Sequence, residues 1–197
     1  MKPGKVLDAI AGEIRICRQC PLWEGACRAV PGEGDPGTKV VFVGEAPGRI
    51  EDLTGRPFVG RSGTLLDALF SKTGIERRSV FIGNLVKHRP PGNRVPRQEE
   101  VRACTPFLSR QIDAIQPSII VTLGRVPAVF FLSLIPVVFT RLGDVRGRLY
   151  PLEWEGRTIR VLPTYHPASA LRNPHHLMLM DEDFSTMVRA LNSPDFS

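Results

Sequence analysis

Three short apolar segments, each followed by a segment with helical spacing, constrain the fold of this chain more than any other feature. They are 39–46 (KVVFVGEA), 80–86 (VFIGNLV) and 118–124 (SIIVTLG). Apolar runs of this length, bounded by turn residues, are typical of strands buried on both faces of a sheet. Alternation of such strands with helices favours a largely parallel sheet with helices on both sides. We therefore predict an α/β fold of three layers, an α/β/α sandwich.

The spacing of apolar residues predicts the helices between and around these strands. In the longest helix, apolar side chains recur every three or four residues, which gives it one inner face. A hairpin is predicted over 148–162, with its turn at Glu155-Gly156. The predicted helices cover 6–14, 62–72, 97–116, 125–134 and 181–191. No repeat or linker interrupts this pattern, so we expect one domain over residues 1–197.

Composition narrows the class of protein only a little. The chain has 26 Lys and Arg against 20 Asp and Glu, a net charge of +6. This surplus suits a polyanion such as nucleic acid, but it also suits plain solubility. The most apolar stretch, 128–139, is interrupted by Ser133 and Pro136 and is shorter than the roughly 18 to 20 residues that cross a bilayer. Charges within the N-terminal helix are unlike a secretory signal. We expect a cytoplasmic protein without membrane contact.

Tight turns or polar residues follow several of the predicted strands. They are 44–48 (GEAPG), Asn84 with the loop after it, and 166–169 (HPAS). In open α/β sheets, ligands bind beyond the carboxyl ends of the strands. Three such segments at one edge of the sheet therefore indicate a single active site.

Two of the candidate segments precede the second apolar strand. The turn at 44–48 lets backbone amides approach a ligand closely, and it carries one carboxylate, Glu45. It is not a phosphate-binding loop, and a turn with a solvated Glu is the alternative. Further along, Phe58 lies between Arg56 and Arg61. That order suits a ring stacked on a base while arginines hold phosphates, and a ring that only fills the core is the alternative.

The other candidates lie later in the chain. The carboxamide of Asn84 can bind the edge of a heterocycle, or it can hydrogen-bond a neighbouring loop. His166 can donate to a developing anion, or it can be a satisfied structural residue. The loops 89–94 (RPPGNR) and 171–174 (LRNP) suit phosphate contacts, with Leu171 as an apolar wedge in a duplex, or they are solvated turns.

Together these segments resemble the family 4 uracil-DNA glycosylases, the iron–sulfur branch found in bacteria and archaea. The motifs that carry the resemblance are GEAPGxxED, TGRPFVGRSG, NLVKxRPPGNR, HPAS and LRNP, in this order between residues 44 and 174. The resemblance runs from Cys17 to Asn173. It implies a central four-stranded parallel sheet, the uracil-DNA glycosylase fold, and a cytoplasmic, nucleoid-associated protein of a prokaryote.

The resemblance implies a DNA repair enzyme that flips uracil out of DNA and hydrolyses its N-glycosidic bond, leaving an abasic site. Phe58 would stack on the flipped base, and Asn84 would bind its polar edge. The substrate-binding positions that the resemblance implies are Gly44, Ala46, Phe58, Asn84, Leu171 and Arg172.

The same resemblance implies a division of labour in the chemistry. Glu45 would position the attacking water rather than act as an obligatory base. His166 would donate to the uracil O2 as negative charge develops on the leaving base. Leu171 and Arg172 would fill or clamp the duplex beside the flipped nucleotide.

The cysteines are where the chain departs from the family pattern. Cys17, Cys20 and Cys104 match three of the four cysteine ligands of a [4Fe-4S] cluster, but His88 stands at the remaining position. We favour His88 as the fourth ligand because it occupies the expected place and imidazole is an acceptable ligand of iron. Cys27 could instead complete an all-cysteine site, and zinc would accept similar ligands. The N-terminal cluster-binding segment would brace the loops that touch DNA.

Two other functions stay open. One is a protein that binds or cross-links uracil-containing DNA with little turnover, and the other is a non-catalytic accessory module on DNA. The loop after His88 is short and has no further histidine, which favours turnover. The intact Glu45, Asn84 and His166 argue against an accessory role. We expect a monomer that binds uracil-containing DNA, double- or single-stranded, with a sliding clamp as a further partner.

Overall fold

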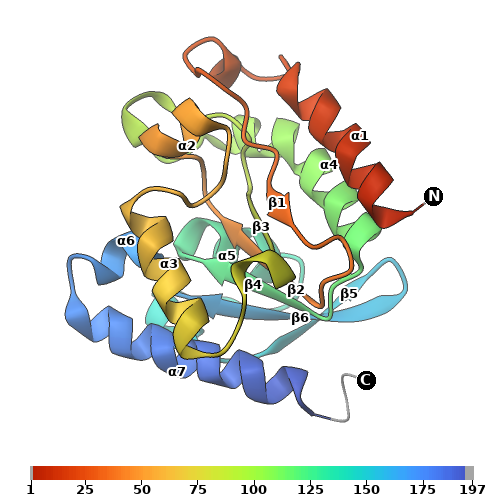
Figure 1. The fold of residues 1–197 in the computed structure, drawn as a ribbon. Coiled ribbons are helices and arrows are strands. Elements are labelled where there is room, and N and C mark those ends of the chain that lie inside the picture. The colour runs from red at the N-terminus through yellow and green to blue at the C-terminus, as the bar shows by residue number, and fades with distance from the viewer. Residues whose placement is uncertain (1, 194–197) are drawn as a thin grey trace.

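The computed structural model describes residues 2–193, and all six strands in that part of the chain form one sheet. The order across the sheet is β1-β3-β2-β4-β6-β5 (Figure 1). The strands are β1 (Glu33–Gly34), β2 (Val40–Gly44), β3 (Phe81–Asn84), β4 (Ile119–Leu123), β5 (Tyr150–Trp154) and β6 (Arg157–Thr164).

The direction of the strands differs from the predicted sheet at both edges. The central strands β3, β2, β4 and β6 run parallel, as predicted. β1 pairs with β3 and β5 pairs with β6 in the antiparallel direction, so the sheet is mixed and six-stranded rather than four-stranded and parallel. β5 is the first arm of the predicted hairpin, which adds a strand to the edge. β1 has only two residues, Glu33 and Gly34, and no apolar pattern marks it.

Helices cover both faces of the sheet, which confirms the three-layer prediction. On one face α3 (Arg61–Lys72) and α7 (Pro174–Leu191) pack over β2, where Phe42, Phe70 and Phe184 meet. On the other face lie α4 (Gln98–Ile115) and α5 (Arg125–Leu132). The N-terminal helix α1 (Pro3–Arg15) runs beside α4 (Figure 1).

Most helix bounds agree with the predictions within two residues, but α7 begins seven residues earlier than expected. Asn173 caps α7, because its Oδ1 accepts a hydrogen bond from the N–H of His175, and Pro174 stands at the first helical position. Two short helices, α2 (Arg49–Thr54) and α6 (Pro167–Ala170), lie in segments predicted as loops. Both flank the candidate site.

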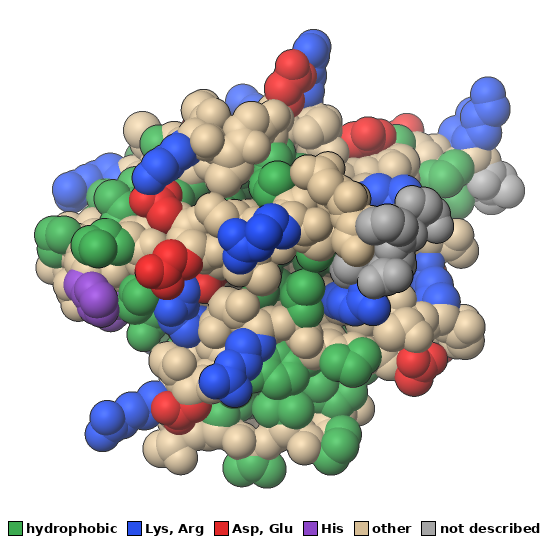
Figure 2. Space-filling view, turned by 90° about the horizontal axis from the view of Figure 1, so that it is seen from below, with side chains coloured by type: hydrophobic (Ala, Val, Ile, Leu, Met, Phe, Trp, Pro, Cys, Tyr) green, Lys and Arg blue, Asp and Glu red, His purple; other side chains and the backbone are tan. Residues whose placement is uncertain are grey.

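The surface below α7 contains basic and acidic side chains side by side, with hydrophobic side chains gathered along one side (Figure 2). Lys72 on α3 pairs with Asp181 on α7, and Arg146 pairs with the buried Asp183. Basic side chains on this face are therefore paired with acidic ones. No helix of residues 2–193 is long and apolar enough to cross a membrane.

Candidate active site

The carboxyl ends of three parallel strands bring the predicted site segments together. β2 ends at Gly44 and β3 ends at Asn84, and these two residues are paired across the sheet. β6 ends at Thr164, two residues before His166. The sheet therefore places the turn after β2, the end of β3 and the HPAS segment at one edge, as the sequence predicts.

Gly44 is packed so closely that no larger residue fits. A Cβ at this position would overlap the side-chain oxygen of Asn84 and would stand 2.6 Å from Cζ of Phe58. Phe58 and Asn84 therefore meet over the backbone of Gly44. The glycine in the GEAPG turn allows this close approach.

The side chain of Asn84 is an unsatisfied polar group. It is 1% exposed, and its Oδ1 has no hydrogen-bond partner among the described residues. A buried polar atom without a partner costs about 1 to 3 kcal/mol, so such an atom is uncommon without a reason. The structure therefore does not show the alternative, a hydrogen bond from a neighbouring loop to this oxygen. Within residues 2–193, the carboxamide oxygen is an acceptor left without a donor at the end of β3.

Phe58 belongs to the core and to the site at the same time. Its side chain is 5% exposed and packs in the cluster that includes Leu66 of α3. Its ring centroid also lies 5.7 Å from that of His166, with 35° between the planes. The ring can therefore fill the core and still be available to stack on a base, because it lies at the border between the core and the strand ends.

His166 is held in one tautomer by its own turn. It caps α6, and its Nδ1 accepts a hydrogen bond from the N–H of Ala168 at 3.0 Å. Burial lowers the pKa of His166 to about 4, with a smaller contribution in the same direction from Arg172. The ring is therefore neutral at physiological pH, and its proton is on Nε2, because Nδ1 accepts. The Nε2–H is a hydrogen-bond donor.

The two residues after Gly44 lie at the same edge. Glu45 is half-buried, and burial raises the pKa of its carboxyl above the usual range. Its backbone oxygen accepts from the N–H of Val86, which ties the turn to the segment after β3. Ala46 is partly buried against the small apolar cluster that contains Val86. Both positions agree with those expected for a ligand-binding turn.

Leu171 and Arg172 lie just beyond α6. Leu171 is 43% exposed, and Arg172 is exposed. His176, to which the sequence analysis gave no role, packs against the residues that precede this segment. The ring of His176 stacks on Tyr165 with centroids 4.0 Å apart, and its Nδ1 lies 3.2 Å from Oγ of Ser169.

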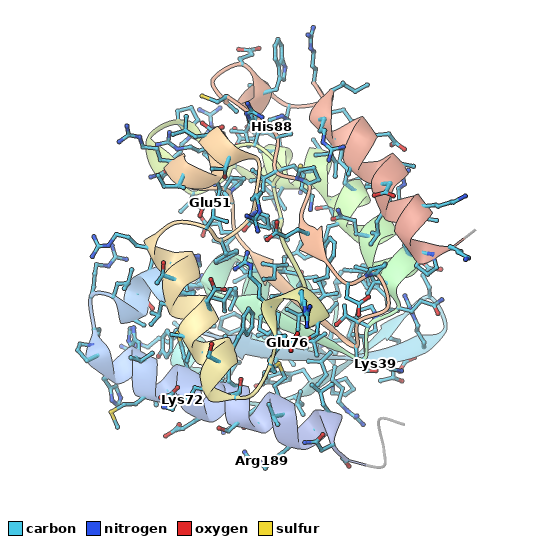
Figure 3. The ribbon with its side chains drawn as sticks, viewed as in Figure 1. Lys39, Glu51, Lys72, Glu76, His88 and Arg189 are labelled. Atoms are coloured by element: carbon cyan, nitrogen blue, oxygen red, sulfur yellow. The ribbon has the colours of Figure 1, made fainter. Side chains whose placement is uncertain are left out.

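The predicted cluster ligands gather at a second corner, which we call the cysteine corner and define by Cys17, Cys20, Cys27, His88 and Cys104. Cys17, Cys27 and His88 line one pocket of about 410 Å³. Cys17 and Cys20 also pack against the apolar cluster that contains the buried Cys104. In Figure 3, His88 lies close to α2 and to the loop that follows α1.

Soft sulfur donors and an imidazole at one corner have the chemistry that iron or zinc prefers. Their arrangement is not that of a finished site. Within residues 2–193, no group of three or more His, Cys, Asp or Glu side chains is placed so that it could hold a metal ion. Both candidates for the fourth ligand, His88 and Cys27, face the same pocket, so this geometry fits either one.

Lys87 connects the two regions, and sequence reasoning did not find it. Its side chain is buried, and its Nζ donates to the backbone oxygen of Asn84 and to Oε1 of Gln111, each at 2.9 Å. Its backbone N–H points to Sγ of Cys104 at 3.2 Å. Burial lowers the pKa of Lys87 to about 8. A lysine in a polar loop motif is normally exposed, so no pattern in the sequence marks this one as internal.

The sheet order, the turn after β2 and the histidine after β6 define a class of protein. The model of the Uracil DNA glycosylase superfamily matches residues 31–192, and the chain belongs to that superfamily. Within it, the chain belongs to the type-4 branch, as the sequence motifs indicate.

The similarity to curated type-4 proteins extends over nearly the whole chain. The chain is 47% identical over 188 residues to the type-4 uracil-DNA glycosylase of Saccharolobus solfataricus, a match that covers 95% of this chain and 87% of that protein. It is 44% identical over 178 residues to the type-4 enzyme of Archaeoglobus fulgidus, covering 90% and 89%. The type-5 uracil-DNA glycosylase of Pyrobaculum aerophilum is less similar, with 30% identity over 170 residues.

Proposed function

We propose that this protein excises uracil from DNA by hydrolysing the bond between the base and C1′ of the deoxyribose. Water adds its oxygen to C1′, the bonding electrons leave with the base, and the products are an abasic site and free uracil. The observation that carries the proposal is the unpaired carboxamide oxygen of Asn84, buried near Phe58, whose ring centroid lies 5.7 Å from that of the neutral His166 ring. This arrangement suits a flat heterocycle with polar edges.

The base reaches this place only after it has left the duplex, at a cost of a few kcal/mol for unstacking. We assign stacking on the flipped uracil to Phe58, and recognition of its polar edge to Asn84. We assign exclusion of water from one side of the base to the backbone at Gly44 and Ala46. Uracil N3–H is a donor, and the Asn84 oxygen is the acceptor that lacks one.

His166 supplies the interaction that strengthens in the transition state. As the glycosidic bond breaks, negative charge collects on the uracil, including O2. We assign donation to O2 to Nε2–H of His166, because Nδ1 already accepts from Ala168. A well-placed donor to a developing anion lowers the barrier by about 3 kcal/mol in a site that excludes water.

Glu45 is suited to hold the attacking water. Burial raises the pKa of its carboxyl, and in its ionised form the carboxylate only accepts hydrogen bonds. A water that donates to Glu45 keeps its lone pair directed away from the carboxylate and toward the sugar. We assign DNA contacts on the rim of the site to Leu171, as a wedge, and to Arg172, as a phosphate contact.

The experiment that tests this function uses a uracil-containing oligonucleotide and protein purified without oxygen. After incubation, alkali and denaturing electrophoresis reveal any abasic site as a strand break at the uracil position. We expect a break at uracil and none in the matching thymine strand. An intact strand carrying covalently bound protein would indicate the cross-linking function, and an intact free strand would indicate the accessory function.

We also propose that the cysteine corner binds a [4Fe-4S] cluster through Cys17, Cys20, Cys104 and His88. The donor types and their shared pocket support this assignment. When bound, the group supplies a rigid link between the N-terminal segment and the segment after β3. The N-terminal segment is also tied to α2, because Oδ1 of Asp52 accepts from the N–H of Cys27 at 2.9 Å.

Metal analysis distinguishes the ligand sets. Cys27→Ser should keep the iron, the sulfide and the broad visible absorbance of the wild type, whereas His88→Ala should lose them. The reverse result would make Cys27 the fourth ligand. Zinc without iron or sulfide would overturn the cluster and support the zinc alternative. The monomeric state and the sliding clamp stay predictions.

A further inference from the structure

The backbone at Phe58 has a conformation that a bulky residue rarely adopts. Its φ is +49°, in the left-handed region. An aromatic residue remains there only when its surroundings hold it, because the conformation costs about 1 to 3 kcal/mol when nothing compensates it. Phe58 is also the ring to which we assign stacking on uracil. The contacts that hold this turn therefore fix where the ring lies.

Arg77 holds the carbonyl groups of the turn. It lies between α3 and β3, and its guanidinium donates to the backbone oxygen of Pro57 at 2.6 Å and to that of Phe58 at 3.1 Å. The same guanidinium pairs with Asp67 at 2.8 Å and with Glu33 at 3.0 Å. Each of its five N–H donors therefore makes a hydrogen bond to a protein acceptor, and these bonds hold the guanidinium in place.

Glu51 holds the N–H groups that follow. It lies on α2, is 9% exposed, and its Oε1 accepts from the backbone N–H of Val59 at 2.9 Å and of Gly60 at 2.8 Å. Figure 3 shows Glu51 beside the segment that leads into α3. On the other side, Gly63 of α3 touches the turn so closely that a Cβ there would overlap the carbonyl oxygen of Phe58.

We propose that Arg77 and Glu51 are positioning residues that set the place of the Phe58 ring, and through it the binding of the flipped base. Glu51 lies within the GEAPGxxED motif but received no role there, and Arg77 is outside every motif that the sequence analysis singled out. Arg77 acts on the carbonyl side of the left-handed residue and Glu51 on the N–H side. The proposal rests on the proposed function, since it needs Phe58 to contact the base.

The test is a double-mutant cycle between Arg77 and Phe58, measured as uracil excision from a single-stranded oligonucleotide. Arg77→Gln should lower kcat/KM on the order of ten- to a hundredfold, because small displacements of a positioned group have effects of this size. In a Phe58→Ala background the same substitution should change kcat/KM less than about twofold, since the ring on which it acts is gone. Arg77→Lys keeps the charge and one or two of the bonds, and should restore part of the loss.

Arg78→Gln is the matched control. It removes the same charge from the next residue, which is exposed and pairs only with the exposed Glu76 among the described acidic residues. We expect wild-type kcat/KM for this variant. Gly63→Ala is a second way to move the turn, because its Cβ pushes on the Phe58 carbonyl without altering any charge. Gly63→Ala should also lower kcat/KM in the wild-type background but not in the Phe58→Ala background. It replaces Arg77→Gln in the test if Arg77→Gln does not fold.

The outcomes separate the inference from the proposed function. A wild-type protein that does not excise uracil contradicts the proposed function itself. If wild type is active and Phe58→Ala is impaired, equal losses from Arg77→Gln in both backgrounds would overturn the inference and leave the function intact. Unchanged kcat/KM in both Arg77→Gln and Gly63→Ala would also overturn it. Loss of activity confined to the background with the ring supports it.

Discussion

The site at the strand ends, which we call the strand-end site and define by Gly44, Glu45, Phe58, Asn84 and His166, is built differently from the cysteine corner. Both regions carry predicted functional residues. At the strand ends, backbone pairing and close packing fix the side chains: Gly44 and Asn84 are paired, and Phe58 packs over Gly44. At the cysteine corner, donor side chains share a pocket, but no group of three within residues 2–193 is placed to hold a metal ion. One region is organised by the fold, and the other has only its donors gathered.

This difference indicates where each region obtains its geometry. A site made from the ends of buried strands inherits its precision from the sheet, and needs no ligand to form. A site made from loops and a helix end obtains its final geometry when the ligand binds, because metal binding and local folding are coupled. Changes at the strand ends should therefore affect the chemistry, and changes at the cysteine corner should affect stability and DNA binding.

The largest effect is expected from His166→Ala. Removal of the Nε2–H donor should lower kcat by about a hundredfold or more, with little change in the thermal unfolding temperature. Single-turnover excision measures the rate, and His175→Ala is the control, because His175 is an exposed histidine nine residues further along. A near-normal rate in His166→Ala would mean that the strand-end site does not act through this donor.

Phe58→Ala should have the next largest effect. Loss of a stacking ring costs roughly 1 to 3 kcal/mol per base, which is about a ten- to hundredfold loss in kcat/KM. Because Phe58 also packs in the core, the variant should be less stable as well. Measuring kcat/KM at a temperature where the variant is fully folded separates the two effects. An unchanged kcat/KM there would make the ring a core residue only.

The sequence predicts the strand-end site better than the rest of the molecule, for physical reasons. Strands buried on both faces leave continuous apolar runs, so β2, β3 and β4 and the residues after them are visible in the pattern. β1 has no such run. It pairs because Gly34, at φ +136°, lets the backbone approach Val80 so closely that a Cβ would overlap the Val80 oxygen. Such a contact has no signature in local sequence.

The missed side chains share a different cause. Lys87 bonds Gln111, 24 residues away, and Arg77 bonds Glu33, 44 residues away. A polar residue that is buried by contacts distant in sequence looks the same in a pattern as one on the surface. The same holds for Glu51, which the GEAPGxxED motif contains but to which no role was assigned. Motifs thus marked residues at the ends of the strands but not the partners that hold them.

The pH dependence of excision sharpens the comparison through Glu45. Because burial raises the pKa of Glu45, the rate should fall on acidification through a midpoint above that of a solvated glutamate. His166 has a pKa of about 4 and stays neutral over that range, so it does not produce this limb. Glu45→Gln keeps an acceptor for water, should lower kcat less than a hundredfold, and should lose the acid limb. An acid limb that persists in Glu45→Gln would assign the titration to another group.

Loss of the cluster should leave the chemistry nearly untouched. Cys20→Ser should lower the iron content and the unfolding temperature, because binding energy at this corner is folding energy. We expect kcat on a short single-stranded substrate to stay within about threefold of wild type, because the strand-end site keeps its geometry independently of the cysteine corner. Ser62→Ala, at the partly buried start of α3, is a control for the effect of a single small substitution away from the cysteine corner. A large fall in kcat would show that Lys87, which touches both regions, transmits the change to Asn84.

The smallest effect is expected from Arg172→Ala. An exposed arginine beside the site contributes to affinity through counterion release, so its removal should lower the slope of log Kd against log salt by about one. Because the contact is to phosphate, the loss should be the same for uracil-containing and uracil-free strands. Lys2→Ala, remote from the strand ends, removes an equal charge and should leave the slope unchanged. An unaltered slope in Arg172→Ala would mean that this loop does not meet phosphate, and the basic loop 89–94 beside the cysteine corner would be the next one to test. In that case the strand-end site would carry the chemistry, and the contact with DNA phosphates would lie outside the 171–174 loop.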